Sequence, residues 1–105
     1  MAKKSNRMAK SAPASGNFSQ LHKFFRIVSD ANRLKILLAL KGGVMNVTQI
    51  HTKLKLPQNL TSHHISKLKS VGLLIEKTEG TFRKYSVNVK KLKEYESLMR
   101  KTFGI

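Results

Sequence analysis

The sequence predicts a mainly α-helical domain that carries one small β-hairpin. Apolar residues recur at helical spacing in five segments, and two short runs rich in β-branched and aromatic residues flank a turn at Gly80. The chain has 105 residues, which is the length of one domain. We expect the folded domain to span residues 17–105, after a disordered basic arm over residues 1–16 that lacks the apolar side chains needed to offset ordering entropy.

Two helices open the predicted domain. One face of the first carries four apolar residues: Leu21, Phe24, Phe25 and Val28. Asp30 is a suitable N-cap for the second helix. This second helix is apolar nearly all round, as Leu34 and Leu38 show, so we expect it to be buried on most sides. Gly42-Gly43 ends it.

A second pair of helices follows. After a possible short strand at Val44-Met45, Asn46 can cap a third helix. A fourth helix starts near Pro57, because proline is tolerated in a first helical turn, and it runs to about Val71. Its inward face carries Thr61, Ile65 and Leu68.

The C-terminal part predicts a hairpin and a last helix. Residues 73–77 and 82–87 form the strands, residues 78–81 join them, and residues 89–103 are helical. Two short helices joined by a turn and followed by a hairpin form a winged helix-turn-helix.

The composition favours a polyanionic partner. Lys and Arg total 21 against 5 Asp and Glu, a formal net charge of +16, and double-stranded DNA carries one negative charge about every 1.7 Å of its axis. Charge alone does not separate DNA from RNA or an acidic membrane. The chain has no cysteine, which excludes disulfides and thiolate metal sites, and no apolar run approaches a membrane span, so we expect no membrane partner. The arm over residues 1–16 either touches DNA or is a solvated tail, with a transit peptide as a weaker third interpretation.

The outward face of the fourth helix predicts base reading. Gln and Asn form paired hydrogen bonds with adenine, Ser is adaptable, and His can reach guanine. The residues expected to read bases are Gln58, Asn59, Ser62 and His63. The residues expected to contact the DNA backbone are Ser66, Lys67 and Lys69 on this helix and Lys77, Arg83 and Lys84 on the hairpin. The alternatives are a solvated polar helix face and a charged edge strand.

Four short motifs in the chain are similar to those of one known protein family. Residues 30–37 (DANRLKIL) are similar to D-P-T-R-L-x-I-L, and residues 56–65 (LPQNLTSHHI) to L-S-Q-S-T-V-S-H-H-L. Residues 72–74 (GLL) are similar to G-L-V, and Glu79-Gly80 with Tyr85 to the E-G-x-x-x-x-Y of the wing. Over residues 21–85 the chain therefore resembles the ArsR/SmtB family of bacterial and archaeal repressors.

The resemblance implies a homodimer that pairs through its first and last helices. The residues expected at that interface are Leu21, Phe24, Phe25, Val28, Leu92, Tyr95, Met99 and Phe103. Alternatively, these stripes only complete the core of the monomer. A domain this short with so many apolar helix faces favours pairing.

The family's metal switch does not match this chain. Asn46 and Thr48 stand where many members have a C-x-C pair, and the last helix has Glu94 and Glu96 but no His or Asp. Carboxylates two residues apart do not share a helix face. We therefore expect no metal and no cofactor, and the effector is unknown. His64, next to His63 on the fourth helix, is expected to tuck against the scaffold with a polar partner.

These observations together predict a homodimeric, sequence-specific DNA-binding regulator, a repressor that binds a palindromic operator in the cytoplasm, associated with the nucleoid. An enzyme is not expected, because adjacent Ser62 and His63 diverge on a helix. Two alternatives stay open: a sequence-tolerant architectural DNA-binding protein, and a winged helix that binds RNA or a protein.

Overall fold

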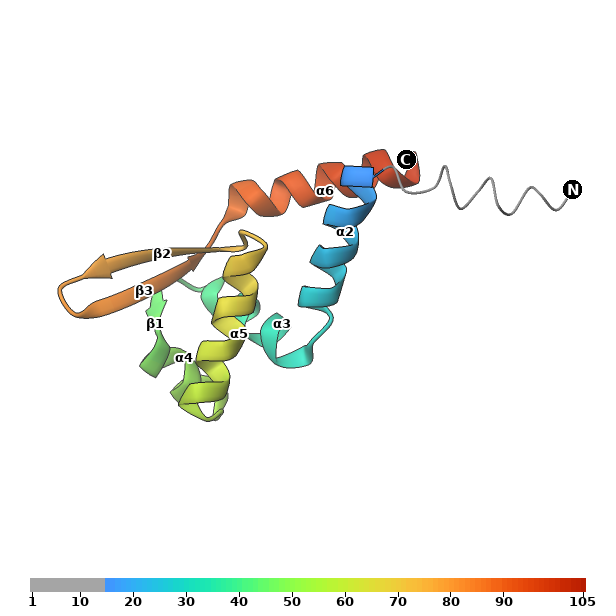
Figure 1. Ribbon diagram of the computed structural model, residues 1–105. Coiled ribbons are helices and arrows are strands. Elements are labelled where there is room, and N and C mark those ends of the chain that lie inside the picture. Colours follow the sequence, from blue (N-terminus) through green and yellow to red (C-terminus); the bar gives the residue numbers. More distant parts are fainter. Residues whose placement is uncertain (1–14) are drawn as a thin grey trace, which may run out of the picture.

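The computed structural model describes residues 15–105. Within this range the elements are α2 (Ser15–Val28), α3 (Ala31–Leu40), β1 (Met45–Asn46), α4 (Val47–Leu54), α5 (Gln58–Ser70), β2 (Leu74–Glu79), β3 (Phe82–Val87) and α6 (Val89–Phe103). The hairpin projects from the helical body at one end, whereas α2 and the end of α6 meet at the other (Figure 1). The described residues thus form the predicted helical domain with a β-hairpin. The predicted arm lies outside the described residues except for residues 15 and 16, which belong to α2.

The three strands form one antiparallel sheet in the order β1-β3-β2. Met45 pairs with Tyr85 and Asn46 with Lys84, so the short β1 joins the hairpin to the start of α4. The hairpin is tighter than the sequence suggested, because Glu79 already pairs with Phe82 and only residues 80 and 81 remain in the turn. Gly80 has a φ of 61°, a left-handed conformation that favours glycine.

Side-chain caps start three of the helices. Asp30 accepts hydrogen bonds from the backbone N–H groups of Asn32 and Arg33 at the start of α3. Asn46 and Gln49 form a reciprocal capping box at α4, with both hydrogen bonds at 2.8 Å. Asn88 caps α6. Both caps predicted from the sequence, Asp30 and Asn46, are confirmed.

The core lies where α3, α4 and α5 meet the base of the hairpin. Its fully buried side chains are Ile36, Ile50, Thr61, Leu68 and Leu73. They come from α3, α4, α5 and the segment directly before β2, so their burial fixes these elements against one another. The inward face predicted for α5 is confirmed, because Thr61, Ile65 and Leu68 are all buried.

An aromatic pair joins α2 to α6. The rings of Phe24 and Tyr95 stack with centroids 4.3 Å apart, and the Tyr95 hydroxyl donates a 2.8 Å hydrogen bond to the carbonyl oxygen of Val71, just after α5. Tyr95 therefore connects α2, α6 and the end of α5. None of the helices in residues 15–105 is long and apolar enough to cross a membrane.

Candidate nucleic-acid interface

Helix α5 presents one polar face to solvent. It begins after Pro57, whose carbonyl oxygen accepts hydrogen bonds from the backbone N–H and the hydroxyl of Thr61, both at 3.0 Å. With the inner face buried, the four residues predicted to read bases are all exposed: Gln58, Asn59, Ser62 and His63. The geometry leaves these short polar side chains free to meet another molecule.

A cleft separates α5 from the hairpin. It encloses about 590 Å³ and is lined on one side by Ser62, Ser66 and Lys69 of α5. Arg83 and Phe82 of β3 line the opposite side. The structure thus brings together one predicted base-reading residue and three predicted backbone contacts. Gln58, Asn59 and His63 do not line the cleft and face solvent on the remainder of α5.

Sequence reasoning missed Thr48 as a residue of this site. Thr48 is exposed on the first turn of α4 and lines the same cleft. The N-terminal turn of a helix carries free backbone N–H groups and a partial positive charge. A polar residue in the first helical turn after the Asn46 cap is the sequence signal for such a position.

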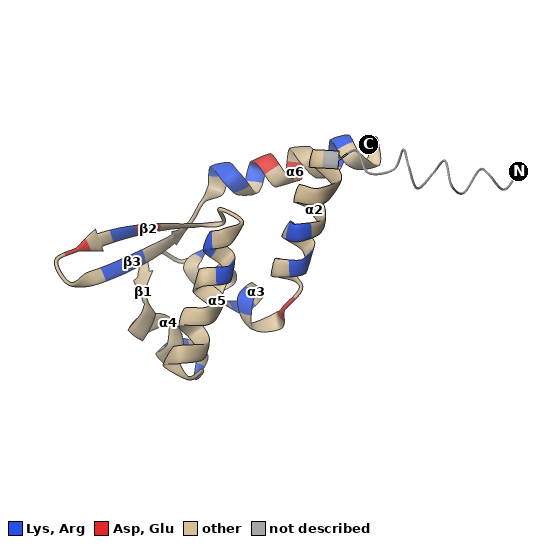
Figure 2. Cartoon of the chain, viewed as in Figure 1, with Lys and Arg blue, Asp and Glu red and all other residues tan. Residues whose placement is uncertain are grey.

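Two acidic residues pair with the predicted phosphate ligands. Glu76 lies between Lys69 (2.6 Å) and Arg83 (4.0 Å), and Glu79 lies 2.7 Å from Lys84. The hydrogen bond from Lys69 holds the pKa of Glu76 below its usual value, and the one from Lys84 does the same for the pKa of Glu79. The pairs with Glu76 hold Lys69 and Arg83 beside the cleft, whereas Lys84 pairs with Glu79 on the other face of the hairpin. Blue basic segments lie along both elements in Figure 2.

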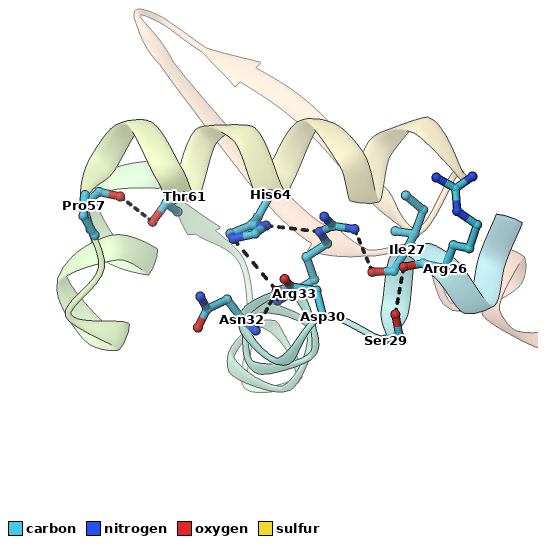
Figure 3. Close-up of polar contacts among 9 residues, drawn as sticks. All are labelled: Arg26, Ile27, Ser29, Asp30, Asn32, Arg33, Pro57, Thr61 and His64. Carbon is cyan, nitrogen blue, oxygen red and sulfur yellow. Dashed lines mark hydrogen bonds and ion pairs between the residues drawn. The ribbon is translucent and has the colours of Figure 1, made fainter.

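His64 differs from its exposed neighbour His63. Only 5% of its surface is exposed, and its Nδ1 accepts a 3.1 Å hydrogen bond from Nε of Arg33. Its Nε2 lies 3.9 Å from Oδ1 of Asp30 (Figure 3). The expectation that His64 tucks against the scaffold with a polar partner is confirmed.

The eight residues predicted at a dimer interface divide into two groups. Leu21, Phe24 and Tyr95 are buried within the chain itself and leave little surface for a partner. The other five keep surface: Phe25, Leu92 and Phe103 are exposed, and Val28 and Met99 are half-buried.

An apolar groove lies beside these residues. It encloses about 550 Å³ between α2, α3, the end of β3 and the start of α6. Phe24, Val28 and Leu92 line it together with two leucines of α3, Leu34 and Leu38, which are 48% and 61% exposed. The expectation that α3 is buried on most sides is therefore wrong for this face. A helix that is apolar all round is normally fully enclosed, and α3 is enclosed only on the side that carries Ile36 and Leu40.

The positions considered for metal binding have other roles. The amide of Asn46 caps α4, and Glu94 pairs with Lys91 at 3.3 Å. Within residues 15–105, no three potential His, Asp or Glu ligands lie close enough together to hold a metal ion.

Comparisons with known proteins agree with this geometry. The family model described as "Bacterial regulatory protein, arsR family" matches residues 30–76, from the cap of α3 into the hairpin. An uncharacterized HTH-type transcriptional regulator of Methanocaldococcus jannaschii is 34% identical over 83 residues, which cover 78% of this chain and 93% of that protein. The transcriptional repressor SdpR of Bacillus subtilis is 32% identical over 74 residues, covering 70% of this chain and 82% of the repressor.

Solved structures share the fold at lower identity. An ArsR-like transcriptional regulator from Rhodococcus superposes with a TM-score of 0.77 at 21% identity, over 86% of this chain and 84% of that one. A homodimeric winged helix-turn-helix DNA-binding domain from Mycobacterium bovis gives a TM-score of 0.68 at 24% identity, over 78% of this chain and 77% of that one. The predicted winged helix-turn-helix is confirmed. The resemblance to the ArsR/SmtB family, which implied a DNA-binding regulator, is confirmed as well. The chain belongs to the arsR family and is a helix-turn-helix transcriptional regulator.

Proposed function

We propose that this chain binds double-stranded DNA as a homodimer and represses transcription by occupying a palindromic operator. The observation that carries the proposal is the exposed polar face of α5 beside a basic hairpin across one cleft. A helix with this exposure fits the major groove, and a hairpin at its side reaches the adjoining backbone. Such a regulator acts in the cytoplasm, where it associates with the nucleoid.

The contacts divide by chemistry. Gln58, Asn59, Ser62 and His63 read base edges, because they are exposed and carry the donors and acceptors that discriminate bases. The phosphate contacts come from Ser66, Lys67, Lys69, Lys77, Arg83 and Lys84. A phosphate strand that follows the cleft meets Lys69 on one side and Arg83 on the other. Thr48 adds a third anchor at the start of α4.

The second copy of the chain covers the apolar groove. Leu34, Leu38 and Leu92 expose a contiguous apolar surface that a monomer in water does not normally leave open. Phe25 and Phe103 extend the apolar surface along α2 and α6. The structurally similar Mycobacterium bovis domain is homodimeric. Leu21, Phe24 and Tyr95 support this interface from inside the chain.

The decisive experiment is selection of bound fragments from random duplex DNA, followed by binding measurements on the best sequence. We expect an inverted repeat with half-sites about one helical turn apart. Gln58→Ala and Ser62→Ala should each lower the preference for that duplex over random DNA by about 1–3 kcal/mol per lost base contact. Gln20→Ala and Ser97→Ala are the matched controls, because both residues are exposed on α2 and α6. Equal loss on both duplexes would contradict base reading.

The dimer is tested by placing a charge in the groove. Leu38→Lys should raise the dimer dissociation constant by about 100-fold, because the lysine ammonium would lose its water in an apolar contact. Ile75→Lys on β2 is the control, since Ile75 is 41% exposed and does not line the groove. Sedimentation equilibrium measures the dimer dissociation constant of both variants. A monomeric wild-type chain would refute the homodimer.

The charge supports a second candidate function. A formal net charge of +16 on 105 residues is sufficient for sequence-tolerant coating of DNA. In that case competition binding at physiological salt would show only a few-fold ratio between the best duplex and bulk DNA. Tighter binding to duplex RNA than to duplex DNA would instead favour an RNA-binding winged helix.

A further inference from the structure

A single guanidinium joins the reading helix to the junction between α2 and α3. Arg33 donates from Nε to Nδ1 of His64 on α5 and from Nη1 to the carbonyl oxygen of Ile27 in the last turn of α2, both at 3.1 Å. Asp30 completes the network, because its carboxylate caps α3 and faces the far nitrogen of the same imidazole (Figure 3). Three helices are thus linked by directional bonds at one point.

We infer that His64 is a positioning residue, which through Arg33 sets the orientation of α5 on α2 and α3. The inference rests on the proposed function, because α2 and α3 carry the groove that the second copy covers. The other inward side chains of α5, such as Ile65 and Leu68, make apolar contacts that are not directional. Hydrogen bonds weaken steeply with angle, so the bond between Arg33 and His64 limits rotation of α5.

The orientation matters because a dimer must place two reading helices on one operator. Half-sites lie about 34–36 Å apart, centre to centre, so a small rotation of α5 against the dimer-forming helices displaces its side chains from the base edges. Base contacts need correct hydrogen-bond geometry, whereas phosphate contacts are largely a matter of charge. Loss of the bond between Arg33 and His64 should therefore reduce sequence preference more than general affinity.

The network holds His64 in one chemical form. Since Nδ1 accepts from Arg33, a neutral imidazole carries its proton on Nε2, on the side of Asp30. The charged or titratable groups that act on His64 are Asp30 at the start of α3, Arg33 on α3 and His63 on α5. A proton on Nδ1 of His64 would face the N–H of Arg33 Nε, and two donors cannot form a hydrogen bond. Only the neutral imidazole therefore accepts the hydrogen bond from Arg33.

Two substitutions at His64 separate the effect of its hydrogen bond from the effect of its side-chain volume. His64→Leu fills a similar space without an acceptor, and His64→Asn returns an oxygen near the place of Nδ1. Residual dipolar couplings on the DNA-free protein report the orientation of α5 against α3. Fluorescence anisotropy then gives the affinities for the selected duplex and for a scrambled duplex of the same composition. Arg33→Met removes the same hydrogen bond from the other side and serves if His64→Leu does not fold.

The expected result is a changed α5 orientation and about a tenfold loss of duplex preference in His64→Leu, with affinity for the scrambled duplex unchanged. His64→Asn should restore both. An unchanged orientation would overturn the inference, and so would a parallel loss of both affinities that asparagine does not rescue. A wild-type chain without any preferred duplex would overturn the proposed function instead, while the couplings on the free protein still decide the role of His64.

Discussion

Tyr95→Phe removes one hydroxyl and tests whether Tyr95 stabilises the fold through contacts within a single chain. The ring of Tyr95 is 7% exposed and stacks on Phe24, and its hydroxyl donates a buried hydrogen bond of 2.8 Å to Val71. Phenylalanine keeps the stack and loses the bond. A typical hydrogen bond contributes about 0.5–1.5 kcal/mol, and a buried carbonyl left without a donor costs about 1–3 kcal/mol. We expect the free energy of unfolding to fall by about 1–2 kcal/mol.

Urea unfolding followed by circular dichroism, at two protein concentrations tenfold apart, checks this value. Because the contact lies within one chain, the loss should be the same at both concentrations and the slope with urea should not change. Leu92→Ala is the control, since Leu92 is 41% exposed in the apolar groove and its effect should depend on dimer concentration. A change below about 0.3 kcal/mol in Tyr95→Phe would refute the reasoning, since that is smaller than any buried hydrogen bond it assumes.

Three further predictions follow from the polar contacts. Burial holds the pKa of His64 below its usual 6.5, so when the pH falls below 6.5 the unfolded chain takes up a proton that the folded chain resists. The free energy of unfolding should therefore decrease between about pH 7.5 and pH 5.5, less steeply in His64→Asn, and equal slopes would contradict this linkage. Glu76→Gln should release Lys69 and Arg83 for phosphate, raising affinity for random duplex DNA and steepening its salt dependence by about one counterion in an anisotropy series; an unchanged slope would show that Glu76 does not compete with phosphate. Asn46→Ala should lower thermal stability by about 1 kcal/mol, since it removes an N-cap, and a melting curve identical to wild type would exclude that role.

Local signals predicted most of the fold. Asp30 and Asn46 were identified as caps because an N-cap depends on residues within one turn. Two strand-like runs on either side of Gly80 predict the hairpin, and the left-handed φ of Gly80 agrees with its place in the turn. The predicted loop, residues 78–81, is two residues longer than the observed turn. The last strand pair, Glu79 with Phe82, depends on the register of the strands, which composition does not indicate.

Apolar periodicity could not show which neighbour covers a helix face. Leu92 and Tyr95 lie three residues apart on α6, yet Tyr95 is buried and Leu92 is 41% exposed. Likewise Leu34 and Ile36 both belong to the apolar α3, and only Ile36 enters the core. Spacing identifies a stripe, whereas the packing partner of each side chain is set by the tertiary arrangement.

The sequence predicts only part of the candidate site, because some of its contacts depend on the tertiary arrangement. The outward face of α5 follows from helical period, and its four base-reading candidates are all exposed. The ion pairs of Glu76 and Glu79 depend on how the strands and α5 meet. The bond between Arg33 and His64 joins residues 31 positions apart, so no local pattern could indicate it.

Asn46 links the register of the sheet to the position of α4. This residue pairs with Lys84 in the sheet and, with its side chain, starts α4. If β1 slipped by one residue along β3, the start of α4 would move by about 3.4 Å along the hairpin. The helix would keep its cap, because the bonds between Asn46 and Gln49 are local, but Thr48 would be displaced relative to Arg83 across the cleft. The two residue pairs that join β1 to β3 therefore fix where the first turn of α4 stands opposite the hairpin.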